Sequence, residues 1–174
     1  MTKWDDLKKQ GVKHLIIDLQ GNGGGYLKTA FDLADELLAN GQLVVYTEGV
    51  HQPRQNLVAT STGQLEDIPV IILVDEYSAS ASEILSGAVQ DWDRGLIVGR
   101  RTFGKGLVQR QFEMPDGSAI RLTTSRYYTP SGRCIQKPYK GVDYQKDIEN
   151  RYRHGEFVSV DSIQFPDSLR YQTL

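Results

Sequence analysis

A serine-rich segment, Tyr77 to Glu83, follows the apolar run that ends at Val74. Its small residues would let a substrate approach the backbone, and we expect Ser80 where a strand turns into a helix. A hydroxyl is exposed at such a junction, and N–H groups at the helix start can stabilise an oxyanion. The pattern S-x-x-E, from Ser80 to Glu83, also matches a capping box, in which the serine only caps the helix. The residues alone leave both interpretations open and favour the cap.

A lysine, Lys105, lies between two glycines in the turn after the apolar run 95–98. A buried lysine can act as a base, because burial disfavours the ammonium form. A Ser–Lys pair needs no histidine, and the three histidines here are scattered, at His14, His51 and His154. None forms a ligand-like pair, so we expect no zinc site. The alternative is an exposed turn lysine.

Two glycine-containing segments suggest anion binding, but weakly. Residues 99–105 match the start of a phosphate-binding loop, yet Gly106 replaces the Ser or Thr that reaches Mg²⁺. The β-like segment that follows also differs from the helix that such a loop opens, so nucleotide binding is disfavoured. The run Gly21–Gly25 could present N–H groups to an oxyanion, or it could be a flexible turn.

The elements expected to position these residues alternate between apolar runs and helical patterns. We expect strands over 14–19, 43–46, 69–74 and 95–98, and helices over 4–10, 27–39 and 78–90. A hairpin over 107–114 and 119–124 turns at 115–117. Residues 51–67 suggest a loop or an irregular hairpin, and from Lys137 onward we expect an extended or partly ordered chain. This order predicts an α/β domain with its site at the carboxyl ends of strands.

Bulk composition narrows the function further. The chain has 174 residues, 39% of them hydrophobic, which suits one compact domain. A net charge of −2 gives no electrostatic reason to expect nucleic acid or an anionic membrane as a partner. No segment approaches the ~18 apolar residues that span a bilayer. The single cysteine, Cys134, excludes an internal disulfide.

Four phrases, taken together and in order, resemble the carboxyl-terminal processing (tail-specific) protease family. They are DLQGNGGGYL, VDEYSASASEILSGAVQD, GRRTFGKGLVQ and DGSAIRLTTSRYYTPSGRCIQ, and the match runs from about Leu15 to Gln136. Lys105 lies 25 positions after Ser80, the separation of the catalytic dyad in this family. That spacing selects Ser80 over Ser78 and Ser82.

The resemblance implies a fold like the crotonase and Clp-protease cores, with stacked β-β-α units and a β-hairpin after the catalytic lysine. It implies that Ser80 attacks the scissile carbonyl, that Lys105 accepts its proton and that Gln109 positions the lysine. The N–H groups of Gly24 and Ala81 would form the oxyanion hole. A further site residue is implied as structural support, Asp91. Substrates would be proteins cut near exposed, apolar carboxyl termini, with no cofactor and no metal.

The chain departs from the family pattern in three ways. Gln20 replaces the usual arginine, which removes a bidentate anchor, and Gly23 replaces a proline. The PDZ domain and a preceding core strand are missing, so we expect a truncated core over 1–136 and an extension over 137–174 that packs on the core or on a partner. A catalytically silent peptide-binding core is therefore the alternative function. The resemblance places the parent protein in the bacterial cell envelope or periplasm, although this chain has no signal peptide, and it leaves a homo-oligomer open.

Overall fold

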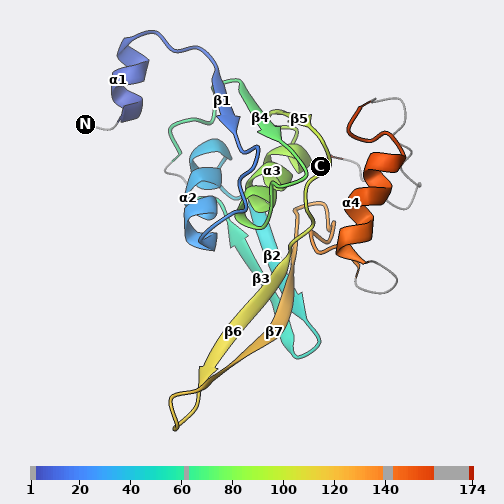
Figure 1. Ribbon diagram of the computed structural model, residues 1–174. Helices are drawn as coiled ribbons and strands as arrows, with labels where there is room; N and C mark the ends of the chain where they lie inside the picture. Colours follow the sequence, from blue (N-terminus) through green and yellow to red (C-terminus); the bar gives the residue numbers. More distant parts are fainter. Residues whose placement is uncertain (1–2, 61–62, 139–142, 159–172) are drawn as a thin grey trace.

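The computed structural model describes residues 3–60, 63–138, 143–158 and 173–174, and it has a mixed α/β fold with one parallel and one antiparallel sheet (Figure 1). The mixed α/β class expected from the sequence is confirmed. No helix within these ranges is long and apolar enough to cross a membrane.

The parallel sheet has three strands in the order β1 (Leu15–Asp18), β4 (Val70–Val74) and β5 (Leu96–Gly99). Each corresponds to an apolar run in the sequence, which is typical of parallel strands, but only the central strand β4 has buried residues. Ile17, Ile72 and Ile97 lie side by side in register. Because the strands are parallel, their carboxyl ends meet at one edge, and the loops that leave this edge carry the candidate residues.

Two helices, α2 (Leu27–Leu37) and α3 (Ala81–Asp91), pack together beside the parallel sheet (Figure 1). Their apolar stripes meet the alternate, buried residues of β4 in the hydrophobic core. A shorter helix, α1 (Lys3–Lys9), precedes the sheet and ends before Gly11, whose φ of 79° suits a helix stop. The core contains Leu37, Leu38, Val44, Val45, Ile72, Val74, Leu85 and Val89.

The antiparallel sheet has four strands in the order β3 (Gln52–Val58), β2 (Leu43–Gly49), β7 (Ala119–Tyr128) and β6 (Leu107–Glu113). The β6–β7 hairpin projects from the body as an arm, and it turns at Gly117 (φ 84°) as the sequence predicts (Figure 1). Pairing of β2 with β3 is interrupted by register shifts. The irregular hairpin considered for this region is therefore correct, and a plain loop is wrong.

Two segments differ from expectation. Helix α3 begins at Ala81, not at Ser78, because residues 78–80 form the turn that enters it. The chain after Lys137 contains a helix, α4 (Tyr144–Arg153), where no regular structure was expected. Its apolar residues are few, with Ile148 and Tyr152 four positions apart, and it also buries an arginine, Arg151, so its overall hydrophobic signal is low. The sequence predicts that the extension over 137–174 packs on the core or on a partner. Tyr139 and most of the segment after residue 158 lie outside the described residues.

Candidate active site

The turn after β4 is fastened to the loop after β1 by Asp75. Its buried carboxylate accepts hydrogen bonds from the backbone N–H groups of Gly21, Tyr77 and Ser78, at 2.9 to 3.0 Å. The Ser78 hydroxyl donates to the carbonyl of Leu19 at 2.7 Å. Burial alone would raise the pKa of Asp75, but these hydrogen bonds lower it below its ordinary value. The two loops are therefore held together at the carboxyl edge of the sheet.

Ser80 lies at the junction of this turn with α3, in a strained conformation. Its φ is 58° and its ψ is −114°, and Ser80 and Asp93 are the only non-glycine residues with positive φ in the described ranges. A helix cap normally has extended backbone angles, whereas strained residues of this kind cluster at functional sites. The capping box expected as the alternative is also present, with the Ser80 N–H donating to Glu83 Oε2 at 2.8 Å. Capping thus accounts for the helix start but not for the strain.

The loop that carries Lys105 is held against Ser80 by the Glu83 carboxylate. Glu83 Oε1 accepts hydrogen bonds from the Thr102 hydroxyl at 2.7 Å and from the Gly104 N–H at 2.6 Å. Glu83 Oε2 accepts one from the Lys105 N–H at 2.8 Å, in addition to the one from Ser80. One buried carboxylate therefore fixes the backbones of both proposed dyad residues.

The dyad side chains themselves are not joined. Lys105 is exposed, so the burial that would make it a base is not observed, and no hydrogen bond connects it with the Ser80 hydroxyl among the described residues. Gln109 is also exposed, on β6 directly after a register shift. The structure thus brings together the backbones of Ser80 and Lys105, whereas no hydrogen bond joins Gln109 to the lysine within the described part of the chain.

The glycine loop after β1 lies directly on the Ser80 turn. Gly24 has a φ of 93°, and a Cβ at this position would lie 2.5 Å from the Ala79 carbonyl oxygen and 2.8 Å from the Ala81 nitrogen. Ala81 is the first residue of α3, where N–H groups have no acceptor within the helix. The Gly24 N–H donates to Asn22 Oδ1 at 2.9 Å. The two predicted oxyanion donors are therefore neighbours, and one of them is occupied by an internal acceptor.

Asp91, at the end of α3, connects the helix to the segment after β7. Its buried carboxylate accepts hydrogen bonds from the backbone N–H and hydroxyl of Ser131, at 2.9 and 2.7 Å. It also forms an ion pair with Arg133 at 2.7 Å. These contacts lie at the opposite end of α3 from Ser80, and they suit the supporting role expected of Asp91.

Sequence reasoning missed two residues that assemble the site. Glu83 was considered only as the partner in a capping box, although that pattern already marked it as a hydrogen-bonding acid. Asn22 was not considered, yet its backbone carbonyl accepts from the Ala79 N–H and the Ser82 hydroxyl, each at 3.0 Å. Its position within the glycine run was the only local signal, because both partners are more than 50 positions away.

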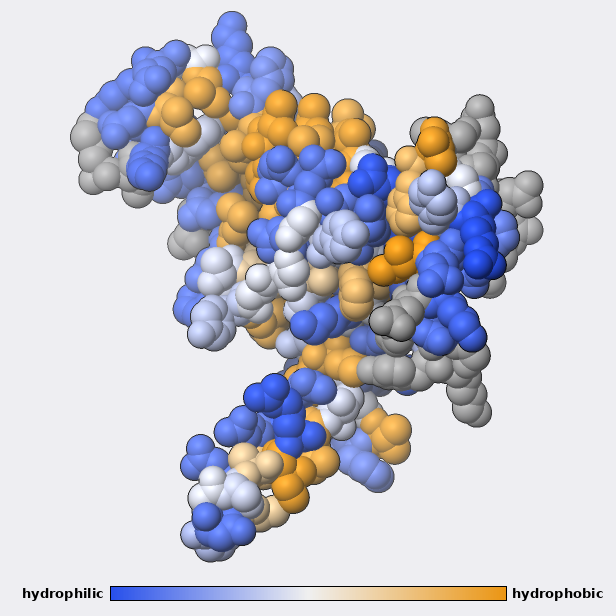
Figure 2. All heavy atoms as spheres, in the orientation of Figure 1, coloured by the Kyte–Doolittle hydropathy of each residue, from blue (hydrophilic) through white to orange (hydrophobic). Residues whose placement is uncertain are grey.

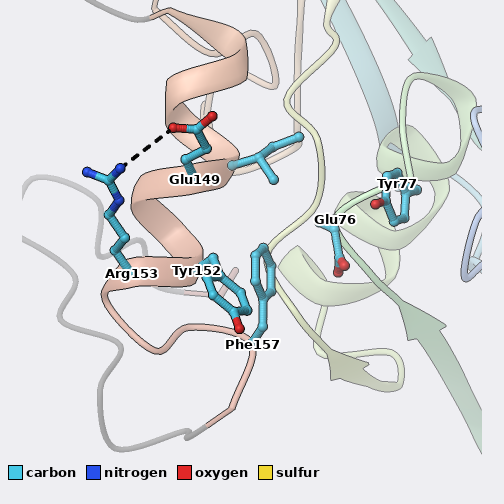
Figure 3. Close-up of a pocket in the computed structure, with 7 residues that line it drawn as sticks. Glu76, Tyr77, Glu149, Tyr152, Arg153 and Phe157 are labelled. Atoms are coloured by element: carbon cyan, nitrogen blue, oxygen red, sulfur yellow. Dashed lines mark ion pairs between the residues drawn. The ribbon is translucent and has the colours of Figure 1, made fainter.

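A pocket of about 450 Å³ lies between the turn after β4 and helix α4 (Figure 3). Tyr152 and Phe157 form a tilted ring pair on one side, with centroids 6.4 Å apart, and Glu76 and Tyr77 face them. Arg100 forms an ion pair with Glu76 at 2.6 Å; burial raises the pKa of Glu76, but this contact lowers it overall. The lining includes neither Ser80 nor Lys105, so the pocket is separate from these two candidate residues.

The phosphate-loop interpretation is disfavoured by the structure. Residues 99–105 lead into strand β6, whereas a phosphate-binding loop opens a helix. The Gly104 and Lys105 N–H groups, which would face a phosphate, donate to the Glu83 carboxylate instead.

The chain matches the family model described as Peptidase family S41 over residues 2–149. It is 39% identical over 145 residues to the chloroplastic C-terminal processing peptidase of Tetradesmus obliquus, which covers 83% of this chain and 31% of that protein. It is 41% identical over 128 residues to a CtpA-like serine protease of Staphylococcus epidermidis, covering 73% and 26%. The chain spans about a third or less of the length of these relatives.

Solved structures give the same result. The photosystem II D1 C-terminal processing protease superposes with a TM-score of 0.70 at 40% identity, over 76% of this chain and 34% of that one. A lipoprotein from Streptococcus agalactiae matches at 20% identity with a TM-score of 0.60, over 75% and 49%, which concerns the fold alone.

Proposed function

The chain belongs to peptidase family S41, and from this premise we propose that it is the core of a carboxyl-terminal processing serine endopeptidase in which Ser80 and Lys105 form the dyad. The observation that carries the proposal is the strained Ser80 turn, which shares the Glu83 carboxylate with the Lys105 loop. A strained serine between a strand and a helix presents its hydroxyl outward, as in other serine hydrolases. A structural cap would need neither the strain nor the lysine.

In the proposed reaction, the Ser80 hydroxyl oxygen attacks the scissile carbonyl carbon while its proton passes to the Lys105 amine. The N–H groups of Gly24 and Ala81 stabilise the oxyanion. The lysine then gives its proton to the leaving amine as the peptide bond breaks. Water, deprotonated by the same lysine, hydrolyses the resulting ester and restores the Ser80 hydroxyl.

Two rearrangements must accompany substrate binding. The Lys105 side chain has to turn from solvent toward Ser80, and the Gly24 N–H has to exchange Asn22 Oδ1 for the substrate oxygen. Such contacts are often long or misdirected without substrate and tighten in the complex. Gln109 would hold the lysine once it has turned inward.

The wider assignments rest on the same family membership. We assign residues 1–136 to a catalytic core with the stacked β-β-α units of the crotonase and Clp-protease folds, and residues 137–174 to an extension that packs on this core or on a partner. The substrates would be proteins with exposed, apolar carboxyl termini. Relatives include chloroplastic and bacterial proteins, and we place the parent of this chain in the bacterial cell envelope.

The test is digestion of an unfolded substrate protein by this chain, beside Ser80→Ala and Lys105→Ala. Either substitution should abolish cleavage, while circular dichroism shows that the variants remain folded. Equal cleavage by all three proteins would contradict the dyad. Equal inactivity, with the wild type folded, would favour the alternative, a catalytically silent peptide-binding core, which the exposed Lys105 side chain also suits.

A further inference from the structure

We propose that Arg151, on helix α4, is a positioning residue for Lys105, because it holds the backbone of the loop that carries the lysine. The proposal rests on the proposed function, since positioning matters only if Lys105 acts as the base. It gives the helix that the sequence did not predict a role in the site.

Arg151 makes its contacts in an almost fully buried position, with 3% of its surface exposed. Its guanidinium donates to the carbonyl oxygen of Arg101 at 2.6 Å and to Glu156 Oε1 at 2.8 Å. Glu156 in turn forms an ion pair with the Arg101 side chain at 3.0 Å. A buried guanidinium is stable only where its donors are satisfied, and here they are directed at the start of the Lys105 loop.

A second contact holds the other end of the same loop. The Lys137 N–H donates to the Gly104 carbonyl at 3.0 Å, and a Cβ at Gly104 would lie 2.9 Å from the Lys137 Cβ. The Lys137 ammonium forms an ion pair with Asp147 of α4 at 2.5 Å. The C-terminal segment therefore holds the loop at Arg101 and at Gly104, directly before Lys105.

These contacts complement the one that Glu83 makes from α3. Glu83 binds the loop through Thr102, Gly104 and Lys105. From the other side, Arg151 of α4 binds the Arg101 carbonyl, and Lys137, which precedes α4, binds the Gly104 carbonyl. A glycine-flanked loop has little conformational preference of its own, so its shape depends on contacts from outside. Since the Lys105 side chain is exposed, the direction in which it leaves the backbone decides whether it can reach Ser80.

The experiment compares the wild type with Arg151→Met, which keeps the apolar stem and removes the donors. The matched control is Arg153→Met on the same helix, because the Arg153 side chain is exposed and its ion pair with Glu149 is long, at 4.0 Å. Hydrogen–deuterium exchange at the amides of Gly104 and Lys105 reports the loop. Reaction with a fluorophosphonate probe, resolved into affinity and maximal rate, reports the serine.

We expect exchange at both amides to be at least about tenfold faster in Arg151→Met and unchanged in Arg153→Met. The maximal labelling rate should fall at least about tenfold with unchanged probe affinity, and Arg151→Lys should restore part of it. A variant that merely unfolds would lose probe affinity and labelling rate together. In that case the exchange comparison is made on Arg151→Lys. Amide exchange at Gly104 and Lys105 should then be about threefold faster in Arg151→Lys than in wild type. Unchanged exchange in the folded variant would overturn the proposal. Faster exchange in a chain that no probe labels would support the hold on the loop and overturn only the proposed activity.

Discussion

At the scale of single residues, Glu83 sets the distance between the two halves of the proposed site. It is 5% exposed, and each carboxylate oxygen accepts two hydrogen bonds. Because no hydrogen bond joins the Ser80 and Lys105 side chains among the described residues, the relation between the two positions depends on this carboxylate. Hydrogen bonds to a charged acceptor are stronger than neutral ones, so the Glu83 carboxylate also stabilises the fold.

Replacing Glu83 with glutamine should lower the stability of the fold and disturb the placement of Lys105 relative to Ser80. The amide NH₂ would face backbone donors, which would leave unpaired either the Gly104 N–H or the N–H groups of Ser80 and Lys105. We expect the free energy of unfolding to fall by about 2 kcal/mol and fluorophosphonate labelling to slow at least about tenfold. Urea denaturation and labelling kinetics measure the two effects. Glu113→Gln, at an exposed position on β6, is the control, and equal behaviour of the two variants would contradict the role of Glu83.

Asp75 should make the stability of the chain sensitive to acid. Its pKa is lowered from the ordinary 3.8 by its hydrogen bonds, despite its burial. A lowered native pKa means that the stabilisation is complete above the ordinary value and is lost as pH falls through the native one. Asp75→Asn should therefore cost about 2 kcal/mol at pH 7, and the difference from wild type should shrink below about pH 4. A difference that stays constant in urea denaturation from pH 7 to pH 3 would show that the charge is not responsible.

Single residues also show where sequence reasoning stops. Ser80 and Lys105 were selected by motif and spacing, and the structure places both at the carboxyl edge of the sheet. Glu83 was assigned only its local partner, Ser80, because a capping box is a pattern of neighbours. Its bond to Lys105 spans 22 positions and two elements, and such a contact depends on the packing of α3 against β5, which local spacing does not encode.

At the scale of elements, the site depends on how closely the glycine loop approaches the start of α3. Asn22 accepts hydrogen bonds from Ala79 and Ser82, and Gly24 leaves no room for a side chain against the backbone of Ala79 and Ala81. The loop and the helix start therefore form one unit. The glycine-rich sequence of this loop is therefore explained by its close contact with the start of α3 as well as by the backbone flexibility of glycine.

An alanine at position 24 should push the glycine loop away from the start of α3. Its Cβ would lie 2.5 Å from the Ala79 carbonyl oxygen, and a φ of 93° is unfavourable for any residue with a side chain. We expect Gly24→Ala to lower the free energy of unfolding by about 2 to 3 kcal/mol and to abolish labelling of Ser80. Gly23→Ala is the matched control, because nothing lies within 4 Å of its Cβ. Thermal and urea unfolding of both variants test this, and a folded, reactive Gly24→Ala would contradict it.

The sequence predicts helices and strands well where the buried side chains are apolar and poorly where the buried side chains are polar or charged. The three strands of the parallel sheet and helices α2 and α3 follow from apolar runs and stripes, to within a few residues. Helix α4 was missed because its buried contacts come from Arg151 and from ion pairs such as Lys137–Asp147. Periodicity scales treat such residues as solvent-facing, so the short apolar pattern of Ile148 and Tyr152 was the remaining local signal for this helix.

At the scale of the whole molecule, the fold leaves apolar surface uncovered. One face of the parallel sheet is open, and Figure 2 shows apolar atoms gathered over β1, β4 and β5. The exposed residues of this face are Ile16, Leu96 and Val98. The projecting β6–β7 arm exposes a second set, Phe112, Met114, Ile120 and Leu122. Parallel sheets in α/β proteins are normally covered on both faces, so an open face is unusual for a parallel sheet.

The open sheet face should behave as one apolar patch. Ile16 and Val98 are 63% and 47% exposed, and they lie on the same side, since Ile16 pairs with Ile71 and Val98 with Leu73, two residues farther along β4. The double variant Ile16→Thr/Val98→Thr should therefore lower the fluorescence of a bound apolar dye by roughly half. Its free energy of unfolding should change by less than about 1 kcal/mol, because exposed side chains contribute little burial.

The control for this patch is Val50→Thr, at the turn between β2 and β3. Val50 is 94% exposed and belongs to the turn between strands of the other sheet, and a single apolar residue on a surface does not form a binding patch. Dye fluorescence should therefore be the same in Val50→Thr and in wild type. If the double variant binds as much dye as this control, the sheet face is not the source of the signal, and the apolar face of the β6–β7 arm becomes the surface that remains to explain it.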